Sequence, residues 1–173
     1  MMRLIILTGA SGSGKTAIAD AIETSRPGLA EVFRFDRIGV PSPEERVKGW
    51  GSGEGWQRAI TLSWINRIAA LRGPSRPVLF EGQMRLAFVQ EGLKSAGIAD
   101  ARLVLVDCDD ATRMHRLGEH RGQPELANPT MMNWAALLRR EAQAGGYDVL
   151  DTSTISLEEA VEQVCALLRG QVS

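Results

Sequence analysis

The sequence from Leu4 to Thr16 reads LIILTGASGSGKT, an apolar run followed by a loop rich in glycine and serine. The loop fits the pattern G-x-x-x-x-G-K-[ST], in which glycines let successive backbone N–H groups point at phosphate oxygens. The apolar run is typical of a strand buried on both faces. A helical stretch follows, and the positive N-terminal end of a helix attracts phosphate. We therefore predict a phosphate-binding loop over residues 9–16.

The motif also predicts a role for each of its residues. Lys15 is expected to reach the β- and γ-phosphates of a nucleoside triphosphate and to act in catalysis. The Thr16 hydroxyl is expected to ligate Mg²⁺. The predicted nucleotide-binding residues of the loop are Gly9, Ala10, Ser11, Gly12, Ser13, Gly14, Lys15 and Thr16.

Strands and helices are expected to alternate along the rest of the chain. The apolar patterns predict strands at 4–7, 32–35, 77–80, 102–106 and 149–150, and helices at 15–25, 56–71, 110–118, 131–144 and 157–168. Residues 41–55 are rich in turn formers and are expected to be a mobile region with a short helix. Alternation of this kind predicts an α/β fold with a five-stranded parallel sheet and helices on both faces, in a single domain over residues 1–173.

Composition narrows the possible functions. The chain has 173 residues, of which 44% are apolar and 24% charged, with a formal net charge of −1. This balance argues against a nucleic-acid coat protein or a polybasic membrane binder, and no apolar stretch is long enough to cross a bilayer. Two cysteines fit a reducing, cytoplasmic location. All but three of the twenty basic residues are arginine, which reflects either codon bias or bidentate contacts to phosphate or carboxylate.

Three acidic residues follow predicted strands and are expected to meet near the phosphate loop, because ligands bind beyond the carboxyl ends of parallel strands. Glu81 is the candidate that holds Mg²⁺ through water; otherwise it is a surface carboxylate. Asp36 is the candidate that orients or deprotonates an acceptor hydroxyl; otherwise it pairs with Arg34 or Arg37. Asp107 is expected to cap a helix rather than to act in catalysis.

These motifs together resemble the small P-loop kinases, such as adenylate, shikimate and gluconate kinases and chloramphenicol phosphotransferase. The resemblance covers nearly the whole chain and implies a P-loop NTPase three-layer sandwich with ATP as donor and Mg²⁺ as cofactor. Residues 81–85, EGQMR, are similar to the Asp-Gly-Phe-Pro-Arg turn of adenylate kinases. By this similarity Glu81 takes the magnesium-side role and Arg85 grips the phosphoryl acceptor. Gln83 replaces the Phe, which disfavours a nucleotide acceptor and makes Gln83 a candidate substrate contact.

Residues 116–124, RLGEHRGQP, are similar to the Arg-Leu-x-x-Arg-Arg-Gly-x-x-Pro lid of shikimate kinases. A short lid is therefore expected over about residues 118–130. The resemblance implies that Arg116 stacks on the nucleotide base and that Arg121 contacts the transferring phosphoryl group. His120 stands in place of an arginine.

The resemblance also implies roles on the acceptor side. Arg139 and Arg140 match the region where these kinases place arginines that contact the acceptor or the transferring group. Asp36 matches the strand-end Asp that acts on the acceptor hydroxyl. Solvated helix positions remain the alternative for Arg116 and Arg140.

The acceptor side itself is expected over about residues 37–72, and Arg58 is a candidate substrate contact there. Trp64 is expected in the core because of its spacing with Ile60 and Ile68. Trp50 and Trp56 either form an apolar wall for a ring-bearing substrate or anchor a loop.

Three functions are consistent with these features. The first is an ATP-dependent phosphotransferase that acts on a hydroxyl of a small molecule. The second is a nucleoside or nucleotide kinase. The third is a nucleotide-binding switch or a nucleic-acid 5′-end kinase, although the net charge gives no support to a nucleic-acid partner. The expected partners are ATP and a small-molecule acceptor, with no membrane, and the protein is expected to be a monomer or a dimer.

Overall fold

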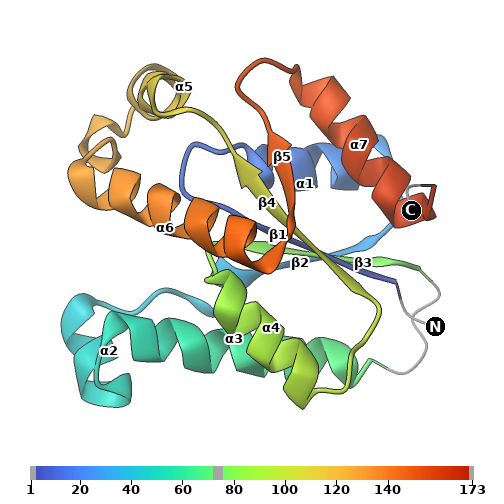
Figure 1. Ribbon diagram of the computed structural model, residues 1–173, viewed down its shortest axis with the longest axis horizontal. Helices are drawn as coiled ribbons and strands as arrows, with labels where there is room; N and C mark the ends of the chain where they lie inside the picture. Colours follow the sequence, from blue (N-terminus) through green and yellow to red (C-terminus); the bar gives the residue numbers. More distant parts are fainter. Residues whose placement is uncertain (1–2, 72–75, 172–173) are drawn as a thin grey trace.

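A parallel sheet of five strands forms the centre of the molecule, in the order β2-β3-β1-β4-β5 (Figure 1). The computed structural model describes residues 3–71 and 76–171. The strands are β1 (Leu4–Thr8), β2 (Glu31–Arg34), β3 (Val78–Gly82), β4 (Ala101–Asp107) and β5 (Asp148–Asp151). Every pairing between neighbouring strands is parallel, so the carboxyl ends of all five strands lie at one edge. The fold class predicted from the sequence is confirmed.

Helices cover both faces of the sheet and give the molecule three layers (Figure 1). They are α1 (Lys15–Ser25), α2 (Pro43–Trp50), α3 (Gly53–Ala69), α4 (Leu86–Ser95), α5 (Asp110–His115), α6 (Pro129–Gly145) and α7 (Leu157–Arg169). Helices α1 and α7 pack together on one face, whereas α3, α4 and α6 supply the apolar cluster on the other. Three short turns complete the described elements: η1 (Phe35–Ile38), the π-helical η2 (Arg116–His120) and η3 (Pro124–Leu126).

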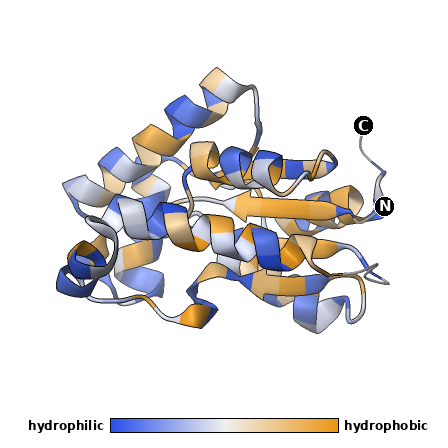
Figure 2. Cartoon of the chain, turned by 90° about the horizontal axis from the view of Figure 1, so that it is seen from below, coloured by the Kyte–Doolittle hydropathy of each residue, from blue (hydrophilic) through white to orange (hydrophobic). Residues whose placement is uncertain are grey.

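The central strand β1 belongs to both halves of the core. Leu4 and Ile6 pack into the cluster under α3, α4 and α6, while Ile5 and Leu7 pack into the cluster under α1 and α7. Alternate side chains of a strand point to opposite faces, so a strand with helices on both sides must be apolar throughout. Figure 2 shows the apolar colouring that runs along such a strand at the centre of the molecule.

The structure refines several predicted elements. Helix α1 has the predicted bounds, whereas Phe35 begins the turn η1 instead of ending the strand. The turn-rich region carries α2, whose first turn is closed by reciprocal hydrogen bonds between Ser42 and Glu45. Helix α4 was not predicted at all. The segment expected on the acceptor side, about residues 37–72, contains α2 and α3, its last residue lies outside the described residues, and its role stays a prediction.

The prediction that Asp107 caps a helix is wrong. Asp109 caps α5 instead, because its carboxylate accepts a hydrogen bond of 2.7 Å from the backbone N–H of Thr112. Asp107 is buried at the end of β4 and is paired with arginines. Within residues 3–71 and 76–171, no helix has the length and apolar character needed to span a bilayer.

Candidate functional site

The phosphate loop joins β1 to α1 at the carboxyl edge of the sheet, and its shape requires glycine. A Cβ on Gly9 would overlap the backbone carbonyl oxygen of Val106. Gly12 and Gly14 have φ angles of +80° and +101°, a region that residues with side chains rarely adopt. The glycines of the motif therefore have a structural cause, and the loop has the conformational freedom needed to turn its N–H groups inward.

Lys15 is the first residue of α1, and its side chain is only 7% exposed. Burial lowers the pKa of Lys15 to about 8, an effect that the nearby Glu81 carboxylate partly offsets. Arg121 lowers the pKa of Lys15 further through its positive charge, whereas Asp36 raises it. Glu81, Arg121 and Asp36 thus all lie close enough to Lys15 to affect its pKa.

Glu81 lies near the end of β3, which is hydrogen-bonded to β1 on one side and β2 on the other. Its Oε2 atom accepts a hydrogen bond of 3.4 Å from the Thr16 hydroxyl. Burial raises the pKa of Glu81, and Lys15 opposes that rise. A hydroxyl and a carboxylate oxygen are the hard donors that Mg²⁺ prefers. The pair Thr16 and Glu81 therefore fits the predicted magnesium role in the chemistry of its donors.

Asp36 follows β2 in the turn η1, and its side chain is exposed. Arg34, which was one alternative partner for Asp36, pairs instead with Asp20 and Glu23 on α1 at 2.5 and 2.9 Å. The Arg34 Nε atom is also 3.9 Å from Glu81. Asp36 thus stands at the same edge of the sheet as Glu81, and it is exposed.

A pocket lies beside the phosphate loop on the side of α1 and α7. Its volume is about 230 Å³, and most of its lining is apolar, from Ala17, Ile18, Ile155, Leu157 and Ala160. Polar residues complete the lining: Arg116, His120, Arg121 and Thr152. An apolar pocket with a few polar groups, next to a phosphate loop, suits a nucleotide base.

Arg116 reaches this pocket, but its guanidinium also binds the protein. It donates to the carbonyl oxygens of Gly12 and Ser13 at 3.1 and 3.3 Å, and to the hydroxyl and carbonyl of Thr152 at 2.9 and 2.7 Å. Arg116 is therefore fixed against the phosphate loop and is not a solvated helix residue. Its predicted stacking on a base stays a prediction.

Two arginines surround Asp107: Arg139, which was expected on the acceptor side, and Arg113, which sequence reasoning missed. Arg113 is fully buried and donates hydrogen bonds of 2.6 Å to Asp107 Oδ1 and to the carbonyl of Ser11. Arg139 pairs with the other oxygen of Asp107 and with Asp110. The helical pattern of residues 110–118 contains no signal that distinguishes Arg113 from a solvated arginine.

The turn after β3 links the phosphate loop to α3. The Gln83 side-chain amide donates a hydrogen bond of 2.6 Å to the hydroxyl of Ser11, while the Gln83 backbone carbonyl accepts one of 3.1 Å from Gln57. Arg85 pairs with Glu141 at 2.6 Å and with Glu54 at 2.7 Å. Gln57, Glu54 and Glu141 were not predicted, because they lie far from the turn in sequence.

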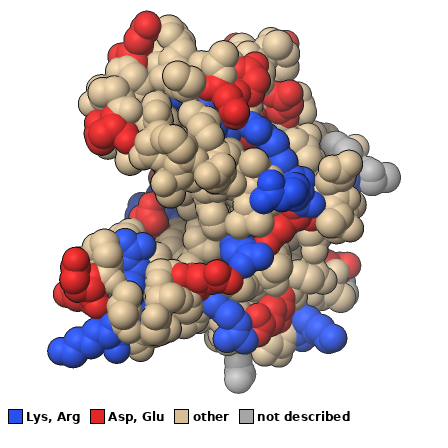
Figure 3. Space-filling view, turned by 60° about the vertical axis from the view of Figure 1, so that its left-hand side comes forward, with Lys and Arg blue, Asp and Glu red and all other residues tan. Residues whose placement is uncertain are grey.

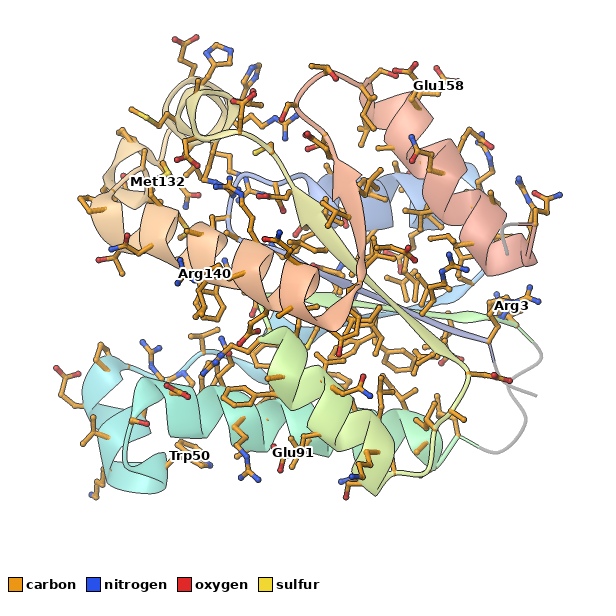
Figure 4. The ribbon with its side chains drawn as sticks, in the orientation of Figure 1. Arg3, Trp50, Glu91, Met132, Arg140 and Glu158 are labelled. Atoms are coloured by element: carbon orange, nitrogen blue, oxygen red, sulfur yellow. The ribbon has the colours of Figure 1, made fainter. Side chains whose placement is uncertain are left out.

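Two other predicted substrate arginines differ in position. Arg58 pairs with Glu91, which Figure 4 shows on the side of α3 and α4 turned away from α6. The structure therefore does not bring the Arg58 guanidinium to the other predicted residues. Arg140 is exposed and lies on the side of α6 that faces α2 and α3 (Figure 4).

The tryptophans also differ from one another. Trp64 is buried in the core, as predicted, and its indole N–H donates to the carbonyl of Phe35 at 3.1 Å. Trp56 is 6% exposed and packs edge-on against Phe35, whereas Trp50 is 41% exposed at the end of α2. Trp56 thus anchors α3 rather than a loop, and of these three tryptophans Trp50 alone is exposed.

The molecular surface is hollowed between the part that carries α5 and α6 and the part that carries α2 and α3, as Figure 3 shows. Basic and acidic side chains are interleaved on the face in this view, without a continuous basic track. The hollow opens toward the carboxyl edge of the sheet, where the phosphate loop lies.

Comparison with solved structures identifies the fold as that of the small P-loop kinases. A shikimate kinase from Acinetobacter baumannii in complex with shikimate superposes with a TM-score of 0.67 at 14% identity, over 99% of this chain and 95% of that one. A gluconokinase from Sinorhizobium meliloti 1021 gives 0.67 at 17% identity, over 97% and 92%. A deoxyadenosine kinase from M. mycoides with bound dATP gives 0.58 at 12% identity, over 97% and 100%.

Sequence comparison adds a coarser description. No family model matches the chain. Two curated proteins of Actinobacillus pleuropneumoniae, serotypes 5b and 7, are each described as a nucleotide-binding protein and are 27% identical over 175 residues. The alignments cover 98% of this chain but 54% of each relative, so the chain spans about half the length of the curated relatives it matches. The single-domain organisation therefore stays a prediction.

Proposed function

We propose that this protein is an ATP-dependent phosphotransferase that moves the γ-phosphoryl group of ATP to a hydroxyl group of a small molecule. The observation that carries the proposal is the placement of three groups at one edge of the sheet: Lys15 at the start of α1, Glu81 near the end of β3 and Asp36 after β2. Glu81 and Asp36 both affect the pKa of Lys15, which supports their proximity. Lys15 and Glu81 would be needed for phosphate and metal binding, respectively. Asp36 is of use to a reaction in which a hydroxyl group loses a proton.

On the donor side, the phosphate loop would hold the triphosphate with its N–H groups and with the N-terminal end of α1. The Lys15 ammonium would contact the β- and γ-phosphates, and Arg121 would approach the transferring group from the predicted lid. The apolar pocket beside Arg116 would take the base. Closure of the predicted lid would exclude water from the site, which would lower the rate of ATP hydrolysis without transfer.

Thr16 and Glu81 would hold Mg²⁺, Thr16 through its hydroxyl and Glu81 through water. A magnesium ion in that position supplies charge neutralisation to the phosphates of the donor. The raised pKa of Glu81 means that this carboxylate is protonated at a higher pH than usual while Mg²⁺ is absent. Metal affinity should therefore weaken as the solution is acidified.

On the acceptor side, Asp36 would accept the proton of the attacking hydroxyl. The acceptor oxygen then bonds to the γ-phosphorus while the bond to the β–γ bridging oxygen breaks, and ADP leaves with that oxygen. Gln83 and Arg140 are the predicted substrate residues with a side chain directed toward the phosphate loop or the hollow. Arg85 and Arg139 would have to exchange their carboxylate partners to contact an acceptor.

A second candidate is a nucleotide-binding protein that does not transfer the phosphoryl group. The description of the curated relatives favours it, since it names binding alone. A nucleoside or nucleotide kinase is a further variant of the main proposal. The pairing of Arg85 with Glu141 and Glu54 argues against a monophosphate acceptor, because the guanidinium is already neutralised.

An ADP-release assay separates these candidates. Purified protein with Mg·ATP should release ADP faster when a panel of polyols, hydroxy acids and nucleosides is added, or when the small-molecule fraction of a cell extract is added. Nucleoside monophosphates test the nucleotide-kinase variant in the same assay. Binding of ATP without acceptor-dependent ADP release under any of these conditions would favour the binding protein and contradict the transferase.

A further inference from the structure

The phosphate loop is held from behind by side chains that lie outside the motif. N–H groups that face a phosphate leave the carbonyl groups of the same loop facing the protein. Three successive carbonyls of the loop accept side-chain hydrogen bonds: Ser11 from Arg113 at 2.6 Å, Gly12 from Arg116 at 3.1 Å, and Ser13 from Thr152 at 2.7 Å. Both arginines come from the segment that leads into the predicted lid.

Arg113 differs from Arg116 in its complete burial. None of its surface is exposed, and its Nη2 atom donates to Asp107 at 2.6 Å and to the carbonyl of Cys108 at 3.3 Å. A Cβ on Gly12 would lie 3.1 Å from Arg113 Cγ, so the arginine also packs directly under the turn of the loop. Arg113 therefore connects the loop to the end of β4 through both hydrogen bonds and packing.

Core packing alone does not explain a guanidinium that is buried in this way. Removing two charges from water costs free energy that their attraction often fails to recover, and apolar residues of similar volume commonly pack as stably. One donor of Arg113 binds a carbonyl of the phosphate loop, which no apolar residue could satisfy. The hydrogen bond to Ser11 thus indicates that Arg113 acts on the phosphate loop rather than only filling the core.

We propose that Arg113 is a positioning residue for nucleotide binding. It holds the Ser11 carbonyl and the turn at Gly12 against β4, and the loop is consequently formed before a nucleotide arrives. A preformed site binds more tightly because less ordering entropy is lost on association. The proposal rests on the nucleotide-binding part of the proposed function and is independent of phosphoryl transfer.

The test compares Arg113→Met and Arg113→Lys with the unmodified protein in two measurements. Arg113→Met should raise the Kd for Mg·ATP by about tenfold, the consequence of one buried carbonyl left without its partner. Arg113→Lys should recover part of the affinity, since an ammonium group can keep a hydrogen bond to at least one of the three acceptors of Arg113. Without nucleotide, hydrogen–deuterium exchange of residues 10–16 should be faster in Arg113→Met.

Two control variants separate positioning from a general loss of stability. Arg26→Met removes an exposed arginine that pairs with Glu162, and it should leave both measurements unchanged. Leu93→Ala removes a buried side chain of α4 in the core on the other face of the sheet. It should lower the melting temperature without changing the exchange of the phosphate loop or the affinity by more than twofold.

The outcomes are distinct. An unchanged Kd and unchanged loop exchange in Arg113→Met would overturn the proposal, as would an equal effect of Leu93→Ala. If Arg113→Met fails to fold, Arg113→Lys decides by the same two readouts. If the unmodified protein binds no Mg·ATP, the proposed function fails, and the exchange measurement still decides whether Arg113 forms the loop.

Discussion

Lys15 shows how a residue of the phosphate loop prepares the site for an anion. Its ammonium group is buried at the start of α1, next to the positive end of the helix, and burial lowers its pKa to about 8. In the free protein, burial thus disfavours the charged form of Lys15, and a bound phosphate would stabilise that form. The same arrangement makes nucleotide binding sensitive to pH.

Affinity for Mg·ATP should fall as the pH rises above 8. The free protein loses the Lys15 proton there, whereas the bound phosphates favour the charged form, so binding must take up a proton. The Kd is expected to rise by up to about tenfold per pH unit between pH 8 and 10. Calorimetry in buffers of different ionisation enthalpy should detect uptake of a fraction of one proton at pH 8. Lys15→Arg should flatten the profile, and a flat profile in the unmodified protein would contradict the buried ammonium.

Asp36→Asn should separate binding from transfer. The Asn side chain keeps the shape but cannot accept a proton, and loss of a general base reduces a rate by about 10²- to 10⁴-fold. The Kd for Mg·ATP should change by less than threefold, as measured by calorimetry, because Asp36 is exposed and lies outside the phosphate loop. Glu44→Gln, an exposed carboxylate in the first turn of α2, serves as the control. Unchanged turnover in Asp36→Asn would remove Asp36 from the mechanism.

Among the elements, α3, α4 and α6 are joined by one charged cluster. Arg85 precedes α4 and pairs with Glu54 of α3 and Glu141 of α6. Glu141 also accepts a hydrogen bond of 2.9 Å from the Leu86 backbone N–H at the start of α4. A carboxylate in that position satisfies a terminal N–H and interacts with the positive end of the helix. The cluster therefore sets the spacing of the helices that border the hollow.

Glu141→Ala should destabilise the protein by about 1–3 kcal/mol, because it removes a cap from α4 and a partly buried partner from Arg85. Urea unfolding measures the change. Glu91→Ala removes the exposed partner of Arg58 and should leave the unfolding curve nearly unchanged, since a solvent-exposed ion pair is screened by water. Equal effects of the two substitutions would show that the cluster is not a specific connection.

Helix α4 is an element that was not predicted from the sequence. Gly92 lies within it, and glycine disfavours the interior of a helix. A Cβ at this position would lie 2.6 Å from the Ile65 Cδ1 atom of α3, so close packing between two helices requires the glycine. Helix α1, in contrast, begins at a motif whose residue pattern is local, and its predicted bounds were correct.

In the whole molecule, the predictable features are those with a local pattern. Five apolar segments and one phosphate-loop motif were sufficient to predict a five-stranded parallel sheet with the phosphate loop at its carboxyl edge. The roles of Lys15, Glu81 and Asp36 at that edge stay predictions. The contacts that shape the acceptor side join distant positions, such as Glu141 with Arg85. Periodicity and motifs contain no information about such pairs, so neither this cluster nor the acceptor could be read from the sequence.

The most direct measurement follows the terminal phosphoryl group of ATP by mass. The protein is incubated with Mg²⁺, ATP labelled with ¹⁸O in the γ-phosphoryl group, and the small-molecule fraction of a cell extract, and the mixture is analysed by mass spectrometry. We expect a new small molecule that contains the labelled phosphoryl group, formed by the unmodified protein and by Glu44→Gln but not by Asp36→Asn. Label found in inorganic phosphate alone, or remaining in ATP, would contradict phosphoryl transfer to a small-molecule hydroxyl.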